Sequence, residues 1–195
     1  MNPAAFFADY DAFGERRTGG EGDAAAAAWL RDRAEATGAA ARLLPAPFTR
    51  LTPGRATLEG AGFAFTGLPL FDGGLTGPDG VAGRLGPLGS DAPIGVAEMD
   101  PAAASLPGNA FALARGDSRH AGIVIALRTK PDGLAPLNAH DLDAPFGPPV
   151  LQLAGRDASR LMALAEAGMQ ARLVAAGTRG PAVSHSIRAE LPGAG

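Results

Sequence analysis

The sequence predicts a mixed α/β (α+β) fold in which a β-rich barrel or sandwich with a few helices lies between a helical start and a final strand. Three observations predict it. Two helical patterns and a strand pattern occupy residues 1–49. From residue 50 glycine and proline recur every few residues between short apolar runs, which is typical of strands joined by turns. A strand–helix–strand pattern follows over residues 146–177, and these changes of pattern divide the chain into 1–49, 50–180 and 181–195.

The segment 146–177 has the clearest periodicity. Residues 149–153 form a short apolar run typical of a buried strand, and Asp157 can accept the first free amides of a following helix. One stripe of that helix is apolar or small: Leu161, Leu164, Ala165 and Gly168. We expect both leucines to be buried, and Gly168 to end the helix in the left-handed conformation. An alternating strand follows: Met169, Ala171 and Leu173 on one face, Gln170 and Arg172 on the other.

Two helices and a strand are predicted before residue 49. The first begins at Asn2, ends near Gly14, and carries its aromatic residues on one face: Phe6, Tyr10 and Phe13. The second spans residues 23–37 with Asp23 as its N-cap, and a strand follows over 40–48. Over residues 50–148, strands are predicted at 56–58, 62–65, 83–85, 94–99 and 121–127, and a helix at 109–119. After a Gly/Pro junction at 178–181, the last strand carries one alternating face: Val183, His185, Ile187, Ala189 and Leu191.

Composition excludes several classes of function. The chain has 195 residues, of which 46% are hydrophobic and 19% charged, so we expect a packed core. A net charge of −3 without a basic stripe argues against nucleic-acid partners. Since there is no cysteine, disulfides, thiolate catalysis and cysteine-bound zinc are excluded. The N-terminus lacks the basic start of a signal peptide and no run is long enough to span a bilayer, so the chain as written is expected to be cytoplasmic, without a membrane partner.

Few residues are candidates for catalysis or metal binding. His140 and Asp143 form a His-x-x-Asp string, but it lies in a proline-rich loop, and we interpret it as a solvated turn with the aspartates capping local amides. His120 is expected near a helix end. His185 stands between two serines, but no serine lies in a G-x-S-x-G turn, so we expect a core or interface histidine. The sequence therefore assigns no catalytic, cofactor-binding or metal-binding residue.

The glycine-rich loop 15–23 is a further candidate, this time for an anion site. It carries Arg16 and Arg17, but it lacks the G-x-x-x-x-G-K-[ST] pattern of a phosphate-binding loop. We expect these arginines to tie the loop to its surroundings or to face solvent.

Several motifs resemble a known family. The strings GLPLFDGG, GVAGRLGPLG, RHAGIVIA and PPVLQLAG occur at residues 67–74, 80–89, 119–126 and 148–155. In this order they resemble a protease-associated domain. RRTGGEGD at 16–23, followed by Trp-Leu, a glycine and an extended apolar segment, is similar to the start of zinc aminopeptidases related to aminopeptidase Y, glutamate carboxypeptidase and the transferrin receptor.

The resemblance implies a non-catalytic N-terminal portion of a zinc metallopeptidase, whose protease-associated domain shapes substrate access. It further implies that this domain, residues 50–180, is inserted between the start of the peptidase domain (1–49) and its second strand (181–195). Zinc is expected in the full-length parent and not in this chain, because the family's adjacent Glu pair is missing. The peptide substrate would be bound through the absent catalytic domain. Because the last strand precedes the absent sheet strands, its free edge also permits an edge-strand homodimer. Two alternatives stay open: a complete peptide- or protein-binding module, and an unrelated α/β domain that binds a small ligand.

Overall fold

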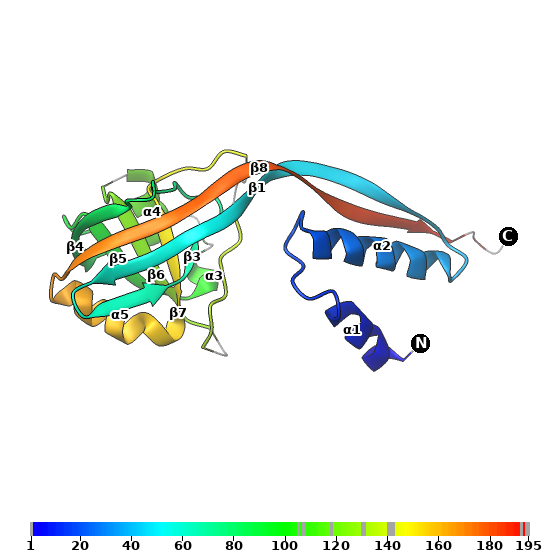
Figure 1. The fold of residues 1–195 in the computed structure, drawn as a ribbon, viewed down its shortest axis with the longest axis horizontal. Coiled ribbons are helices and arrows are strands. Elements are labelled where there is room, and N and C mark those ends of the chain that lie inside the picture. Colours follow the sequence, from blue (N-terminus) through cyan, green and yellow to red (C-terminus); the bar gives the residue numbers. More distant parts are fainter. Residues whose placement is uncertain are drawn as a thin grey trace. The chain divides into compact units, whose positions relative to one another are not determined.

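A computed structural model describes residues 2–104, 106, 108–117, 119–129, 132–139, 143–191 and 193. The chain divides into two compact units. Unit 1 comprises Met1–Arg50 and Arg179–Gly195, and unit 2 comprises Leu51–Thr178. Two strands, β1 (Ala40–Gly60) and β8 (Gln170–Glu190), are neighbours in the sheet and run through both units (Figure 1).

Unit 2 is built on a mixed sheet. Its other strands are β2 (Phe63–Thr66), β3 (Leu68–Pro69), β4 (Val81–Pro87), β5 (Ile94–Met99), β6 (Gly122–Leu127) and β7 (Val150–Ala154). The strand order is β2-β1-β8-β4-β5-β6-β7-β3. Strands β4 to β7 are parallel to one another, whereas β2, β8 and β3 pair antiparallel with β1, β4 and β7.

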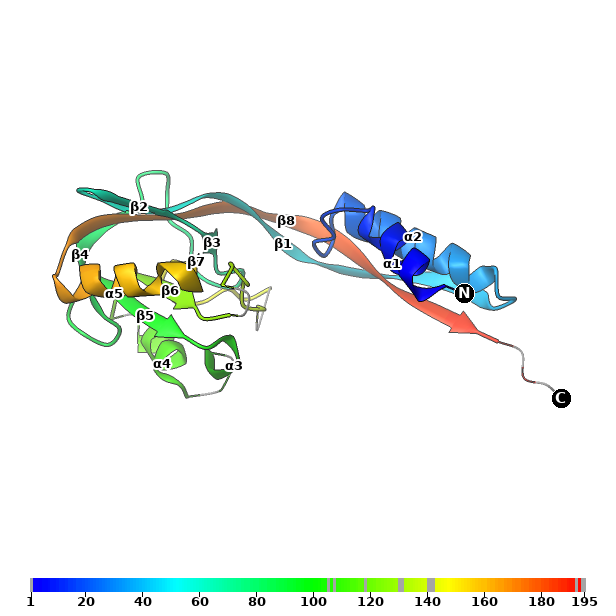
Figure 2. The same ribbon diagram turned by 90° about the horizontal axis from the view of Figure 1, so that it is seen from below.

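Helices cover both faces of the parallel strands, as Figure 2 shows. The helices are α3 (Pro101–Ala104), α4 (Ala110–Asp117) and α5 (Ala158–Glu166), the last preceded by the 3-10 turn η1 (Gly155–Asp157). Strand β6 is buried throughout. Its Val124 packs with Leu161 of α5, and its Ile123 packs with Phe111 of α4. Successive side chains of β6 point to opposite faces of the sheet, so they contribute to two separate cores, one on each face.

Unit 1 contains α1 (Pro3–Asp11) and α2 (Glu21–Glu35) beside parts of β1 and β8. Asn2, where the first helix was predicted to begin, caps α1 through its side chain. The Trp29 ring of α2 lies 4.9 Å, 6.1 Å and 5.8 Å from those of Phe6, Tyr10 and Phe13 (centroid to centroid). The predicted aromatic face of α1 is therefore the contact between the two helices.

Several short elements of unit 2 agree with the sequence prediction, but the predicted strand 56–58 lies inside β1, β4 extends beyond the predicted 83–85, and β3 and α3 were not predicted. Strand β5 matches the predicted 94–99, and β6, β7, α4 and α5 lie within two residues of their predicted bounds. Gly168 has a φ of 62°, which confirms the left-handed end of α5. Asp157 occupies the N-cap position of α5, but its side chain makes no capping hydrogen bond there, so that detail of the prediction was wrong.

The prediction was also wrong where it ended the long strands. Strand β1 continues past residue 48, and the proposed junction 178–181 lies inside β8. Glycine and proline signalled turns there, but Gly177 has a different role. A Cβ on Gly177 would lie 2.8 Å from the carbonyl oxygen of Thr52, so glycine permits close approach of β1 and β8.

The start of α2 needs a similar correction, because its N-cap is Gly20 and not Asp23. Asp23 lies in the first turn, where its carboxylate accepts the Gly19 N–H at 2.8 Å. Asp23 is the third residue of the helix, and its carboxylate accepts a hydrogen bond from the backbone of the loop that precedes the helix. The same carboxylate accepts the Ser184 hydroxyl of β8 at 2.8 Å, which ties α2 to the strand.

Candidate functional site

The described part of the chain contains no metal centre. Within it, no three His, Asp or Glu residues lie close enough together to hold a metal ion. Asp143 is exposed in a bend, whereas His140 lies outside the described residues. No described helix combines the length and apolar character needed to cross a membrane. The expectations of no metal ligand and no cofactor site in this chain stay predictions.

His120 is a structural residue of unit 2. Its ring is 1% exposed, and Nδ1 lies 2.7 Å from the Ala92 carbonyl oxygen while Nε2 accepts the Gly89 N–H at 2.9 Å. These partners place the ring proton on Nδ1 and occupy both nitrogens. The ring also lies directly against Gly95, where a Cβ would be 2.6 Å from Cδ2. His120 therefore closes the turn between β4 and β5, three residues beyond the end of α4.

His185 is not part of a Ser-His-Asp arrangement. Ser184 donates its hydroxyl to Asp23 on the α2 side, and strand alternation places His185 on the opposite face of β8. The ring is half-buried, and Nδ1 is enclosed without a hydrogen-bond partner among the described residues. The serine and the histidine are therefore sequence neighbours that face different surroundings.

The loop before α2 uses its polar groups internally. Arg16 donates to the carbonyl oxygens of Tyr10 at 2.9 Å and Gly14 at 3.1 Å, and its guanidinium lies 4.3 Å from the Tyr10 ring centroid. Arg17 pairs with Glu15 and accepts the Gly20 N–H through its carbonyl oxygen at 2.8 Å. The glycine-rich loop therefore folds on itself, and its geometry does not form an anion cradle.

A buried ion pair that no sequence motif indicates lies in unit 2. Arg115 of α4 donates through Nη2 to Asp72 Oδ1 at 3.1 Å, and their side chains are 4% and 1% exposed. The same nitrogen donates to the carbonyl oxygens of Asp72 at 3.0 Å and Phe146 at 3.2 Å. The guanidinium stacks on the Phe146 ring, 3.8 Å from its centroid. We call Asp72, Arg115 and Phe146 the arginine latch.

The arginine latch holds three separate segments together. Burial lowers the pKa of the Arg115 guanidinium from its ordinary value, while the neighbouring Asp72 charge opposes that shift. Arginine nevertheless stays charged in proteins at neutral pH, so the carboxylate is needed as its counterion. The latch fixes the turn after β3 and the segment before β7 to helix α4. The arginine latch therefore stabilises the fold, and its ion pair is buried away from solvent.

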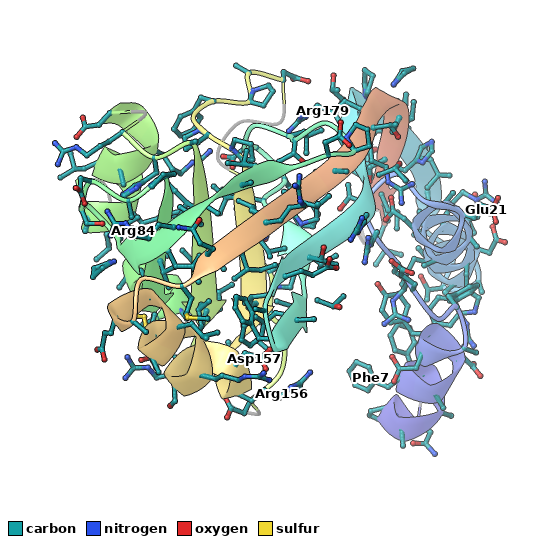
Figure 3. All side chains as sticks on the ribbon, turned by 60° about the vertical axis from the view of Figure 1, so that its left-hand side comes forward. Phe7, Glu21, Arg84, Arg156, Asp157 and Arg179 are labelled. Carbon is teal, nitrogen blue, oxygen red and sulfur yellow. The ribbon has the colours of Figure 1, made fainter. Side chains whose placement is uncertain are left out.

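Gln152, in the middle of β7, likewise connects separate segments of the chain. Its Oε1 accepts the Leu137 N–H at 2.7 Å, and its Nε2 donates to the Pro69 carbonyl oxygen at 3.1 Å. At the surface of unit 2, Arg84 of β4 pairs with Asp91 and lies apart from Arg156 and Asp157 of η1 (Figure 3). The buried polar residues of the described chain thus hold the fold together, and they offer no catalytic constellation.

The fold itself is shared with known hydrolases. An aminopeptidase from Aneurinibacillus sp. strain AM-1 superimposes with a TM-score of 0.64 and 15% sequence identity, over 95% of this chain and 47% of the other. A zinc aminopeptidase from Bacillus subtilis gives 0.63 and 16%, over 91% and 43%. A peptidase M28 precursor from Shewanella amazonensis SB2B gives 0.58 and 16%, over 92% and 48%.

These likenesses define a class of fold. The chain has the mixed α/β architecture of part of these peptidases, and it spans about half of their length. At such identities the likeness concerns the fold alone. No family model matches the sequence, and no curated protein matches it.

Proposed function

We propose that the chain is the N-terminal, non-catalytic portion of a zinc-dependent aminopeptidase-like hydrolase. In this proposal unit 2 is a protease-associated-like domain inserted into the peptidase domain, and it shapes the access of peptide substrates. The observation that carries the proposal is the fold likeness over 95% of this chain to an aminopeptidase about twice as long.

The organisation of the two units supports an insertion. Unit 2 is a single continuous segment, Leu51–Thr178, and unit 1 contains chain from both sides of it. Unit 2 also has its own cores on both faces of its sheet. An inserted domain needs a core of this kind, because its host joins it only at its two ends.

The catalytic groups would lie in the remainder of the longer protein. A zinc aminopeptidase needs histidine and carboxylate ligands and a carboxylate that activates the bound water. The described residues gather no such set. In the proposed parent protein, zinc and the peptide substrate would therefore be bound by the catalytic part, while this chain supplies framework and access control.

The first prediction follows from the proposal that the catalytic groups lie outside this chain. The purified 195-residue chain is expected to carry no stoichiometric zinc by elemental analysis and to leave aminoacyl-p-nitroanilides uncleaved, with or without added zinc. If the gene continues beyond residue 195, the longer product is expected to bind zinc and cleave these substrates. Stoichiometric zinc and hydrolysis in the short chain, both lost on His140→Ala or Asp143→Ala, would overturn the proposal.

A further inference from the structure

The turn between β4 and β5 closes over a single buried ring. We call residues 89–92 the turn tip. Within the tip, the Gly89 N–H donates to Nε2 of His120, and Nδ1 of the same ring donates to the Ala92 carbonyl oxygen. Ala92 is fully buried, so this part of the turn lies inside unit 2. The first and last residues of the turn tip therefore depend on one side chain, which follows helix α4 in sequence.

Other hydrogen bonds of the turn tip are local or exposed. The Ser90 N–H donates to the Pro87 carbonyl oxygen at 3.0 Å, and the Ser90 hydroxyl accepts the Ala92 N–H at 3.3 Å. Arg119 donates to the Gly89 carbonyl oxygen at 3.1 Å, but this bond is exposed to water, which competes for both groups. The two bonds to His120 are therefore the buried anchors of the turn tip.

Only an uncharged imidazole can make both of these bonds. The uncharged ring has one N–H and one unprotonated nitrogen, whereas the charged ring has a proton on each nitrogen. Charging His120 would convert Nε2 into a donor that faces the Gly89 N–H, with 2.9 Å between the two nitrogens. The charge would also lie in a ring that is 1% exposed and packed directly against Gly95. Burial of an unpaired charge is unfavourable, so the closed turn selects the uncharged ring.

The surroundings of the ring offer a second proton no counterion. Charged side chains occur in four positions of the adjoining segments: Arg84, Asp91, Asp117 and Arg119. Asp91 is already paired with Arg84 and its side chain is 90% exposed, and Asp117 at the end of α4 is exposed as well. The parts of β5 and β6 that adjoin the ring, residues 94–97 and 122–127, contain no titratable side chain.

We propose that His120 makes the β4–β5 turn a pH-sensitive element, which is closed while the ring is uncharged and released when mild acid protonates it. Histidine is suited to this role because its charge ordinarily changes between about pH 5 and pH 8. The cores on the two faces of the sheet are formed by apolar side chains and do not depend on this ring, so the release is local. The proposal does not rest on the peptidase proposal.

The direction of the pH effect follows from proton binding. When the turn is open, the ring is free to bind a second proton, whereas the closed turn holds it in the uncharged form. The open form therefore binds more protons than the closed form, and the stability of the closed turn rises with pH and falls in acid.

Hydrogen exchange of the Gly89 amide, followed by NMR in the 195-residue chain, tests the proposal. Its protection, corrected for the exchange rate of an unstructured chain, is expected to fall about thirtyfold from about pH 7.5 to about pH 5. This size applies to a ring that titrates like free histidine when the turn is open and binds no second proton when it is closed. The Ile123 amide, which donates to the Pro149 carbonyl oxygen in the buried sheet, should keep its protection. Aspartate and glutamate ordinarily titrate near about pH 4, below this range.

His120→Gln separates the ring from other groups. Its amide offers a donor and an acceptor but binds no proton in this range, so the protection of Gly89 should no longer depend on pH. His185→Gln, which removes the half-buried histidine of unit 1, is the matched control and should show the full decrease. A constant protection of Gly89 in the unmodified chain, an equal decrease at Ile123, or an undiminished decrease in His120→Gln would overturn the proposal.

The ring of the unmodified chain gives a test that needs no substitution. Nitrogen chemical shifts at about pH 7.5 are expected to show an uncharged His120 with its proton on Nδ1, and the ring should become charged only together with the loss of Gly89 protection. A proton on Nε2, or a charged ring while Gly89 stays protected, would contradict the proposal.

Discussion

Asp72→Ala is expected to lower the free energy of unfolding by about 3–5 kcal/mol, because it leaves the buried charge of Arg115 without its counterion. Both side chains of this pair are almost completely buried. The guanidinium would keep its hydrogen bonds to two backbone carbonyl oxygens, but these carry no full negative charge. The loss is expected to be much larger than the small contribution of an ordinary surface ion pair.

Urea unfolding followed by circular dichroism measures this effect. Asp91→Ala is the matched control, since it breaks the exposed pair of Arg84 and Asp91, whose Nη2 and Oδ1 atoms are 2.9 Å apart. We expect little change in that variant. If Asp72→Ala were as mild as Asp91→Ala, the arginine latch would not stabilise unit 2.

Leu161→Ala is expected to destabilise the chain by about 2–5 kcal/mol, as for buried leucines generally. Leu161 is fully buried in the core between α5 and the sheet, with Val124 and Leu153 in the same cluster. Leu164 was expected to be buried as well, but it is only partly buried at the edge of this core. Leu164→Ala is therefore expected to cost less.

The same unfolding measurement compares the two leucine variants. A loss near zero for Leu161→Ala would mean that α5 does not pack on the sheet as described. An equal loss in both variants would mean that Leu164 is buried as deeply as Leu161.

Local periodicity predicted the short elements of unit 2 because each buries one face or is buried throughout. Strand β6 is an apolar run that is buried throughout, and the buried residues of helix α5, Ala158, Leu161 and Ala165, follow the helical period. The continuation of β1 and β8 was not predictable in this way. Gly177 signals a turn by composition, but its contact with Thr52 of β1 depends on a pairing 125 residues apart in sequence (177 − 52).

The contacts of the buried polar residues could not be predicted from the sequence either. His120 was expected near a helix end, but its partners Gly89 and Ala92 come from the β4–β5 turn. The arginine latch joins residues 43 apart in sequence, and neither Asp72 nor Arg115 stands in a motif that indicates burial. Such pairs become visible only when the tertiary structure brings their segments together.

Hydrogen exchange tests most directly the claim that unit 2 is a self-contained inserted domain and unit 1 part of a larger one. In monomeric protein, amides of residues 123–126 and 150–153 are expected to be protected far longer than those of 184–190. The first two sets lie in fully buried strands, whereas the residues of the third set, in β8, are half-buried or exposed. Long protection of the first two sets with rapid exchange of the third is the predicted result. Equal protection of all three sets in monomeric protein would contradict the claim, because it would make the 195-residue chain a single self-sufficient folding unit.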